Sequence, residues 1–301
     1  MQEATARPPV LSVAPMVRHS HRHARRLWAL LCPAAVLHTE MQPARSFIRR
    51  AAALPPPPDP AVLQLAGDDP AELAAAAALG ARLGFAGLNL NCGCPSPRAT
   101  AAGFGACMMA RPRRIGECLR ALRDASGLPV TLKCRLGVDK DEPAEALPAV
   151  IDAAAAAGAA GVAVHLRSAW LKGVNPRANR SRPPLRPEWG PRIKRGWPQL
   201  QVVGNGGVRS VAEAEERCAG VDGVMLGRAI VSQPLLLAEF ATRWFGRPPL
   251  KLAAVLERYF AHCVRERAAG VPAARLLQPL YGLLHGRPRA SRARAELAAA
   301  A

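Results

Sequence analysis

The sequence predicts an α/β fold, a (β/α)8 barrel of the TIM type followed by a small C-terminal helical domain. Eight short apolar or β-branched runs alternate with helical patterns across residues 10–245, and eight such units close a barrel. The glycine fingerprint G-x-G-x-x-G of doubly wound dinucleotide-binding sheets does not follow the first run. After Gly246 only helical patterns remain, which places a domain boundary there.

The eight strands are expected where short apolar runs are bounded by turn residues. They cover residues 10–16, 36–41, 61–66, 87–91, 130–136, 161–166, 201–204 and 223–226. Helical patterns cover residues 20–33, 44–53, 70–83, 113–125, 143–157, 188–196, 210–219 and 234–244. Asp69 and Pro70 strengthen the third helix start, because Asp caps free N–H groups and Pro fits the first turn.

Two domains follow from this pattern, a barrel over residues 1–246 and a helical domain over residues 247–301. The second should contain helices at residues 251–267 and 273–284. The prolines of residues 55–58 indicate a rigid surface loop within the barrel, because the strand count continues through them.

Composition excludes several classes of protein. A chain of 301 residues that is 50% hydrophobic can bury a core, unlike a disordered tail or a disulfide miniprotein. Its apolar runs are too short to cross a bilayer. The eight cysteines lack framework spacing and no targeting segment is visible, so we expect reduced thiols and a cytoplasmic location. We also expect a monomer. Cys92 and Cys94 have no second pair at zinc spacing, so no metal site is expected.

The positive charge is concentrated in three segments. The formal net charge is +19, yet residues 61–164 hold ten basic and ten acidic side chains. The excess lies in residues 1–60 (eight basic, three acidic), 165–197 (nine against one) and 243–301 (eleven against three). If a compositional bias of the genome caused the excess of basic residues, the middle of the chain would carry that excess too. The distribution therefore favours a polyanion such as a nucleic acid as partner.

Polar side chains follow nearly every predicted strand, at the end where a barrel carries its active site. Asn205-Gly206-Gly207 and Gly227-Arg228 end the seventh and eighth strands, and their N–H groups with one guanidinium suit a phosphate. Lys133 and His165 end the fifth and sixth strands, and the Gln64 amide suits the edge of a planar ring. Each feature alone is common in structural turns. Together they predict a cradle for a phosphorylated planar cofactor.

Cys107 is the candidate reactive thiol. It ends a loop that begins at Cys94, and Gly103 and Gly105 allow that loop to turn sharply and bring Cys107 to the barrel mouth. A thiol there can act as a nucleophile or as a proton donor. Cys94 is expected to be a turn and packing residue, Cys92 and Cys134 are expected to pack beside strands, and the remaining cysteines lie on helical patterns and are expected to be structural.

At these residues the sequence resembles the tRNA-dihydrouridine synthases, and specifically their A-type bacterial branch. The resemblance extends in family order over residues 10–245 and is weaker beyond. The most specific stretch is the Asn-Cys-Gly-Cys-Pro loop with its downstream Gly-Ala-Cys. The matching stretches are Ser12-Val-Ala-Pro-Met, His38-Thr-Glu-Met, Leu63-Gln-Leu-Ala-Gly, Leu88-Asn-Leu-Asn-Cys-Gly-Cys-Pro-Ser, Gly103-Phe-Gly-Ala-Cys-Met-Met, Val130-Thr-Leu-Lys, Asn179-Arg with Pro183-Pro-Leu, Gly204-Asn-Gly-Gly-Val-Arg-Ser and Asp222-Gly-Val-Met-Leu-Gly-Arg.

The resemblance implies an FMN-dependent barrel that reduces the C5=C6 bond of uridines in the tRNA D-loop, with NADPH or NADH as reductant. The A-type match favours positions 20 and 20a. It implies that Cys107 protonates C5 of the uracil. The implied FMN ligands are Ala14, Pro15, Met16, Gln64, Lys133, His165, Asn205, Gly206, Gly207, Gly227 and Arg228.

The resemblance also implies where tRNA binds, namely the segment after the sixth strand and the C-terminal helices, which carry two of the three basic segments. The implied substrate and tRNA contacts are Asn91, Phe104, Arg177, Arg180 and Arg294.

The chain departs from the branch after Met16, where it reads Val17-Arg-His-Ser-His-Arg-His, and at residues 277–281, where Leu-Gln-Pro-Leu-Tyr replaces an expected Arg-His pair. Two other functions therefore remain open. One is an FMN barrel that reduces a small pyrimidine or enone, which would leave the basic tail unexplained. The other is a non-catalytic RNA-binding barrel, which would bind no flavin.

Overall fold

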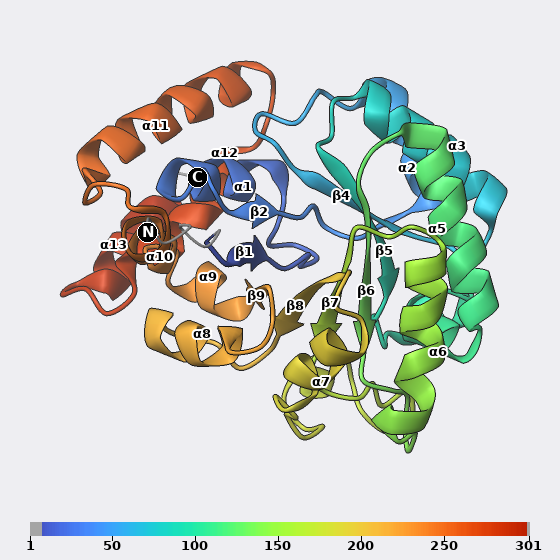
Figure 1. The fold of residues 1–301 in the computed structure, drawn as a ribbon. Helices are drawn as coiled ribbons and strands as arrows, with labels where there is room; N and C mark the ends of the chain where they lie inside the picture. Colours follow the sequence, from blue (N-terminus) through green and yellow to red (C-terminus); the bar gives the residue numbers. More distant parts are fainter. Residues whose placement is uncertain (1–7, 300–301) are drawn as a thin grey trace, which may run out of the picture.

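A computed structural model describes residues 8–299 of the chain. Its parallel sheet closes into a barrel covered by helices on the outside (Figure 1). The sheet order is β2-β1-β9-β8-β7-β6-β5-β4-β3. The strands are β1 (Val10–Val13), β2 (Val36–Leu37), β3 (Gln42–Pro43), β4 (Val62–Ala66), β5 (Gly87–Cys92), β6 (Val130–Arg135), β7 (Gly161–His165), β8 (Gln201–Asn205) and β9 (Gly223–Leu226).

The second predicted strand, residues 36–41, is divided into β2 and β3. Val36 and Leu37 pair with β1, whereas Gln42 and Pro43 pair with β4. Between them His38 forms a parallel bridge to Val62, and the Thr39 N–H donates to the Val62 carbonyl. The chain changes partners at this point, which closes the barrel and explains why nine strands replace the eight expected.

The barrel helices occur where the apolar periodicity predicts them. For α3 the predicted start is confirmed, since the Asp69 carboxylate accepts the N–H groups of Ala71 and Glu72. These helices are α1 (Arg22–Leu31), α2 (Ala44–Arg50), α3 (Pro70–Arg82), α5 (Pro112–Ser126), α6 (Pro143–Ala156), α7 (Trp189–Gly196), α8 (Val211–Cys218) and α10 (Leu236–Phe245).

Short helices that the sequence did not predict lie in loops at the strand ends, where they are too brief for a periodic pattern. They are α4 (Pro97–Ala101), α9 (Arg228–Ser232) and 3-10 turns at Gly105–Ala110 and Ala178–Arg180. The helix predicted over residues 44–53 ends in a 3-10 turn at Ala51–Ala53. Inside the barrel, the small apolar cluster of Ala14, Ala163, Val203 and Met225 fills the space beneath the strand ends.

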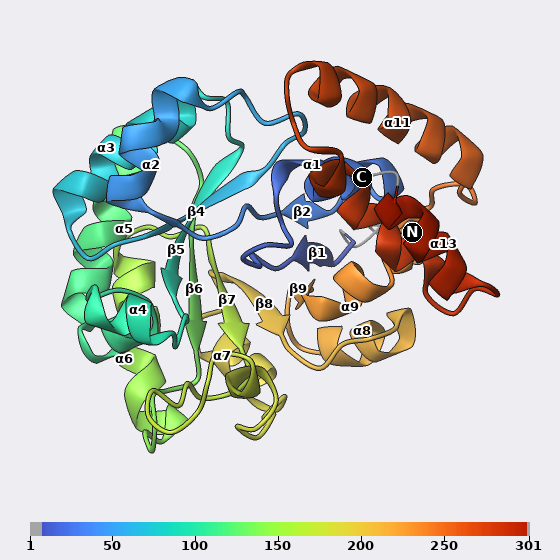
Figure 2. The same ribbon diagram turned by 180° about the vertical axis from the view of Figure 1, so that it is seen from behind.

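The C-terminal segment forms α11 (Leu252–Ala268), α12 (Ala273–Leu277) and α13 (Ala290–Ala299). The helix expected over residues 273–284 changes to a 3-10 turn at Gln278–Leu284, where Pro279 has no N–H to donate. In both views the C-terminal helices lie on the side of the barrel that carries α1, and α11 and α12 pack against that helix (Figures 1 and 2). Buried Tyr259 and Leu276 belong to the same apolar cluster as Leu11 and Leu27. The domain boundary near Gly246 stays a prediction.

Within residues 8–299 we find no helix with the length and apolar character needed to span a membrane.

Candidate active site at the strand ends

Three buried amides from adjacent strands form one network. Gln64 Nε2 on β4 donates to Asn89 Oδ1 on β5 at 2.7 Å, and Asn91 Nδ2 donates to Gln64 Oε1 at 2.9 Å. Asn91 Oδ1 also accepts the N–H groups of Gly93 and Cys94. The network orients the Gln64 amide and shapes the turn that leads to Cys107. Asn91, expected to contact substrate, thus uses its side chain within the protein.

Lys133 places a partly buried ammonium group near the end of β6. Its Nζ donates to Asn205 Oδ1 on β8 at 3.0 Å, and Asn205 Nδ2 donates to the Met225 carbonyl on β9 at 2.7 Å. Burial lowers the pKa of Lys133 to about 8, with a smaller effect from Arg135. A partly buried cation whose protein acceptor is a neutral amide favours an anionic or electron-rich ligand.

The glycine turns of β8 and β9 lie beside Met16 and His165. Gly206 and Gly207 have φ of +126° and +82°, values that favour glycine. A Cβ on Gly206 would approach His165 Cδ2 at 3.1 Å, and one on Gly227 would approach Met16 Sδ at 3.5 Å. The structure thus brings together residues from β1, β7, β8 and β9 that the sequence assigned to one cofactor.

Four arginines surround these turns and include two that the sequence analysis missed. Buried Arg135 donates to the carbonyls of Gly93, Ser168 and Asn179, and Arg167 donates to the Pro183 carbonyl. Arg228 Nη2 donates to the Arg180 carbonyl at 3.2 Å. Among the ion pairs of residues 8–299, none includes any of these four arginines.

The four arginines also act on one another. The pKa of Arg135 falls to about 10 because of burial first, and then because of the charges of Arg167 and Arg180. Burial, followed by the charges of Arg135 and Lys133, keeps the pKa of His165 well below its usual value, so this imidazole is neutral. Such mutual repulsion is relieved by bound anions.

Cys107 lies on the 3-10 turn after the predicted glycine hinge. Gly103 and Gly105 have φ of +78° and +86°, and a Cβ on Gly105 would meet the Cys94 carbonyl at 2.5 Å. The Cys107 Sγ–H donates to the Phe104 carbonyl at 3.3 Å. Burial raises the pKa of the Cys107 thiol, although Arg111 acts in the opposite direction. The thiol is therefore protonated at neutral pH and can donate a proton.

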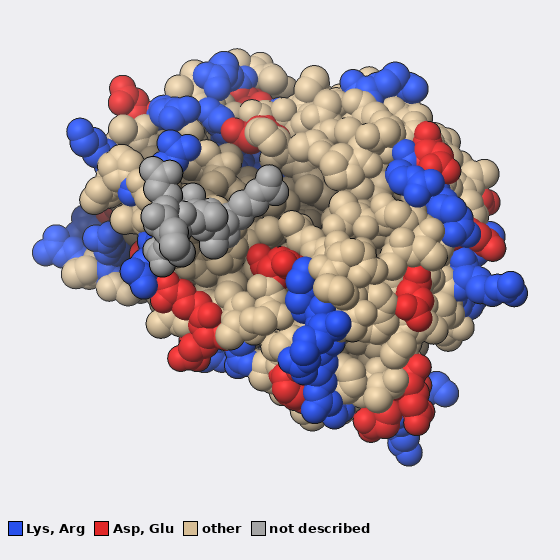
Figure 3. All heavy atoms as spheres, viewed as in Figure 1, with Lys and Arg blue, Asp and Glu red and all other residues tan. Residues whose placement is uncertain are grey.

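The expected tRNA contacts are distributed over two parts of the surface. Arg177 and Arg180 are exposed on the loop before α7, whereas Arg294 is exposed on α13. Figure 3 shows Lys and Arg side chains gathered over α7 and its preceding loop, and others at the edge that carries α11 and α13. Phe104 is 9% exposed, so it contributes mainly to the core beneath the Cys107 loop.

A group of possible metal ligands lies away from this site, between α1 and α11. His23, His262 and Glu266 bring donor atoms within 4.8 Å of one another. His23 Nδ1 and His262 Nε2 are 3.0 Å apart and form a hydrogen bond, while Glu266 pairs with Arg22 at 3.3 Å. No motif spacing could reveal this group, because 239 residues separate the two histidines.

Comparison with known proteins shows the family to which the chain belongs. A family model described as dihydrouridine synthase matches residues 12–298. The chain belongs to the dihydrouridine synthase family. Both the resemblance and its A-type branch are confirmed by relatives named tRNA-dihydrouridine(20/20a) synthase. The one from Xanthomonas campestris pv. campestris is 43% identical over 92% of this chain and 84% of its own length. The one from Yersinia pestis is 35% identical over 95% and 85%.

Solved structures place this dihydrouridine synthase in the expected fold class. An old yellow enzyme homologue from Zymomonas mobilis superposes with a TM-score of 0.55 and 12% sequence identity, over 82% of this chain and 92% of that one. At this identity the likeness concerns the fold alone, and it confirms the predicted barrel.

Proposed function

We propose that this protein is an FMN-dependent tRNA-dihydrouridine synthase that reduces the C5=C6 bond of D-loop uridines, at positions 20 and 20a, with NADPH or NADH as reductant. The observation that carries the proposal is the cluster of cations at the strand ends, in which Arg135 is buried whereas Arg180 and Arg228 are exposed. Lys133 and four arginines converge there on two glycine turns, and Cys107 lies on the loop after β5.

The residues present fit FMN. A phosphate carries two negative charges, and Arg228 with the glycine N–H groups at residues 206, 207 and 227 offers the donors and the unpaired cation that such a group needs. Lys133 and Gln64 present an ammonium group and an amide to a planar ring edge. Ala14, Pro15 and Met16 supply the apolar surface on which that ring lies. Asn205 orients Lys133, and the neutral His165 borders the phosphate turn.

When bound, FMN supplies the hydride for C6 of the uracil. The protein's own part is to hold the base and to deliver one proton. Cys107 donates that proton to C5, and its raised pKa keeps the thiol protonated until it is needed. Asn91 and Phe104 shape the turn and the loop base that place Cys107.

The uridine must leave its stack to enter this site, so the enzyme has to bind the tRNA around it. Arg177 and Arg180 border the mouth of the barrel, and Arg294 extends the basic surface on α13. We assign catalysis to the barrel, residues 1–246, and tRNA binding to the helical part, residues 247–301. A monomer working in the cytoplasm, where tRNA is abundant, fits this arrangement.

Two measurements test the proposal. The purified protein should show flavin absorption that bleaches with NADPH in the absence of air. Wild-type protein, but not Cys107→Ala, should restore dihydrouridine at D-loop positions 20 and 20a in a strain that lacks its synthase. Bleaching without tRNA modification would favour a reductase of a small pyrimidine or enone. A colourless protein that takes up no FMN would favour an RNA-binding barrel.

A further inference from the structure

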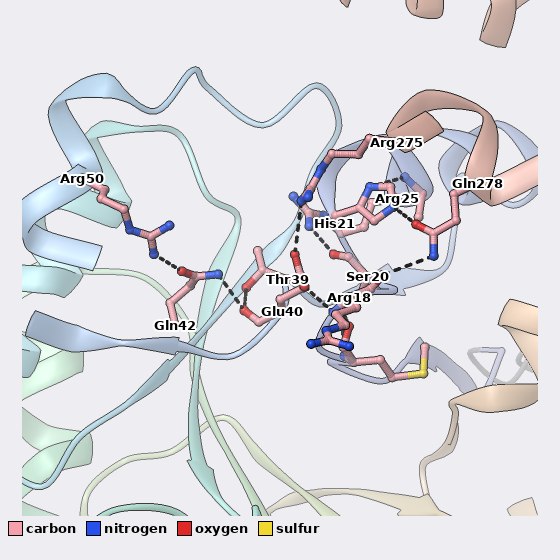
Figure 4. Close-up of polar contacts among 12 residues, drawn as sticks. Arg18, Ser20, His21, Arg25, Thr39, Glu40, Gln42, Arg50, Arg275 and Gln278 are labelled. Atoms are coloured by element: carbon pink, nitrogen blue, oxygen red, sulfur yellow. Dashed lines mark hydrogen bonds and ion pairs between the residues drawn. The ribbon is translucent and has the colours of Figure 1, made fainter. Parts of the chain in front are cut away.

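Glu40 occupies the point where the barrel changes strand partners, between β2 and β3. Its side chain is 20% exposed and faces two segments that are far apart in the sequence. One oxygen, Oε1, accepts the backbone N–H of Arg18, and the other, Oε2, lies 3.8 Å from Arg275 Nη2 on α12. Figure 4 shows Glu40 between these two partners.

On one side Glu40 holds a strained turn. Arg18 has φ of +70°, which costs a non-glycine residue free energy. The turn is tight, because the Ser20 side chain accepts the Met16 N–H at 2.8 Å and the Ser20 N–H donates to the Met16 carbonyl at 2.9 Å. Met16 belongs to the apolar surface assigned to the flavin ring. The Glu40 carboxylate therefore helps to set the position of that surface.

On the other side Glu40 contacts the C-terminal helices. Arg275 is the last basic residue of α12, and Gln278, one helical turn later, makes a second bridge to the same barrel turn. Gln278 Nε2 donates to the Arg18 carbonyl at 3.5 Å, and Gln278 Oε1 lies 3.0 Å from His21 Nε2. Arg275, through Glu40, and Gln278, directly, thus hold the region around α12 against residues 18–21 (Figure 4).

The backbone of Glu40 continues toward the buried amide network. Thr39 Oγ1 donates to the Glu40 carbonyl at 2.8 Å and accepts the Gln64 N–H at 3.0 Å. Gln64 in turn binds Asn89 and Asn91. A continuous set of polar contacts therefore runs from Arg275 through Glu40 to two parts of the flavin cradle.

We infer that Glu40 is a positioning residue that couples tRNA binding at the C-terminal helices to flavin binding at the strand ends. The inference rests on the proposed function, since it assigns the two ligands as that function does. Bound tRNA would restrict the movement of α12, and the pair between Arg275 and Glu40 would pass this restriction to the Glu40 carboxylate. Glu40 in turn holds the turn that carries Met16. By thermodynamic reciprocity, tRNA then strengthens the hold on FMN.

The rate at which FMN leaves the holoenzyme tests the coupling. Release would be followed by the gain of flavin fluorescence, with and without a saturating unmodified tRNA transcript. In the wild type tRNA should slow release about two- to fivefold, the range expected for one partly exposed ion pair. Glu40→Gln keeps an acceptor for the Arg18 N–H but loses the negative charge. The ratio of the FMN release rates without and with tRNA should therefore fall to near one. Arg275→Met should do the same.

A matched control is the ion pair between Arg243 and Glu215, at 2.8 Å on the outer helices α10 and α8. Glu215→Gln should keep the wild-type response to tRNA. An unchanged response in Glu40→Gln and Arg275→Met, or no response in the wild type, overturns the coupling and leaves the proposed function intact. A protein that holds no FMN overturns both. Loss of the response in Glu215→Gln as well would show that any charge loss has this effect, and would also refute the role of Glu40.

Discussion

Gly105→Ala is expected to disable the enzyme through the position of Cys107. The change has two costs. At φ of +86° an alanine carries a strain of about 1–2 kcal/mol. Its Cβ would also lie 2.5 Å from the Cys94 carbonyl oxygen, and relieving such an overlap with the backbone costs about 1–3 kcal/mol more. We therefore expect a total loss of about 2–5 kcal/mol in the free energy of unfolding.

Gly127→Ala separates the two costs. Gly127 ends α5 with φ of +65°, and no atom lies within 4 Å of the position that an alanine Cβ would occupy there, so the variant should lose only the strain, about 1–2 kcal/mol. Urea unfolding of both variants gives the difference between their losses of stability, which is the cost of the overlap with the Cys94 carbonyl. Dihydrouridine formation on a tRNA transcript gives the functional effect, which should be about 100-fold in Gly105→Ala, since a shift of about 1 Å at a reacting group costs that much. Gly127→Ala should stay within about twofold. Equal stability and equal activity of the two variants would refute the reasoning.

Three further predictions follow from the electrostatics. First, burial lowers the pKa of His23 to about 3 and that of His38 to about 4. Because these pKa values lie below the usual 6.5, the contribution of both histidines to the free energy of unfolding is complete above about pH 6.5. It is lost as the pH falls toward 4. Urea unfolding between pH 7 and pH 4 should show declining stability, and a flat profile would contradict it. Second, Lys133→Met removes a partly buried ammonium group, so the melting temperature of the flavin-free protein should stay level or rise while FMN is released at least tenfold faster. A variant that retains FMN would exclude Lys133 from the cradle. Third, Arg228→Ala should weaken FMN retention at least tenfold, whereas Arg82→Ala on the exposed face of α3 should not, and equal retention in both would remove Arg228 from the phosphate site.

The sequence could predict the fold, and which residues the strand ends bring into one region, because both depend on local patterns. Strand ends are recognisable from apolar runs, and a barrel brings those ends together whatever the loops do. Lys133, Asn205 and Gly227 were therefore identified as one site from their places in the chain. The hinge glycines before Cys107 were found for the same reason, since a positive φ is a property of single residues.

Contacts that depend on distant segments could not be predicted. Arg135 lies two residues beyond Lys133, but its buried side chain is explained only by three carbonyls from two separate loops, one after β5 and one after β7. The bond between His23 and His262 and the contact between Glu40 and Arg275 likewise join opposite ends of the chain. The second strand was predicted as one piece because apolarity does not report where a strand changes its neighbour.

The shared apolar cluster of α1, β1, β9 and the C-terminal helices has a consequence for the newly made protein. Leu11 and Leu27 near the start of the chain are covered by Tyr259 and Leu276 near its end. The first strand can therefore reach its final surroundings only after the last helices have left the ribosome, because contacts between distant segments form late. Until then the emerging chain exposes the apolar surface of its first helix, and an uncovered surface of this kind favours aggregation.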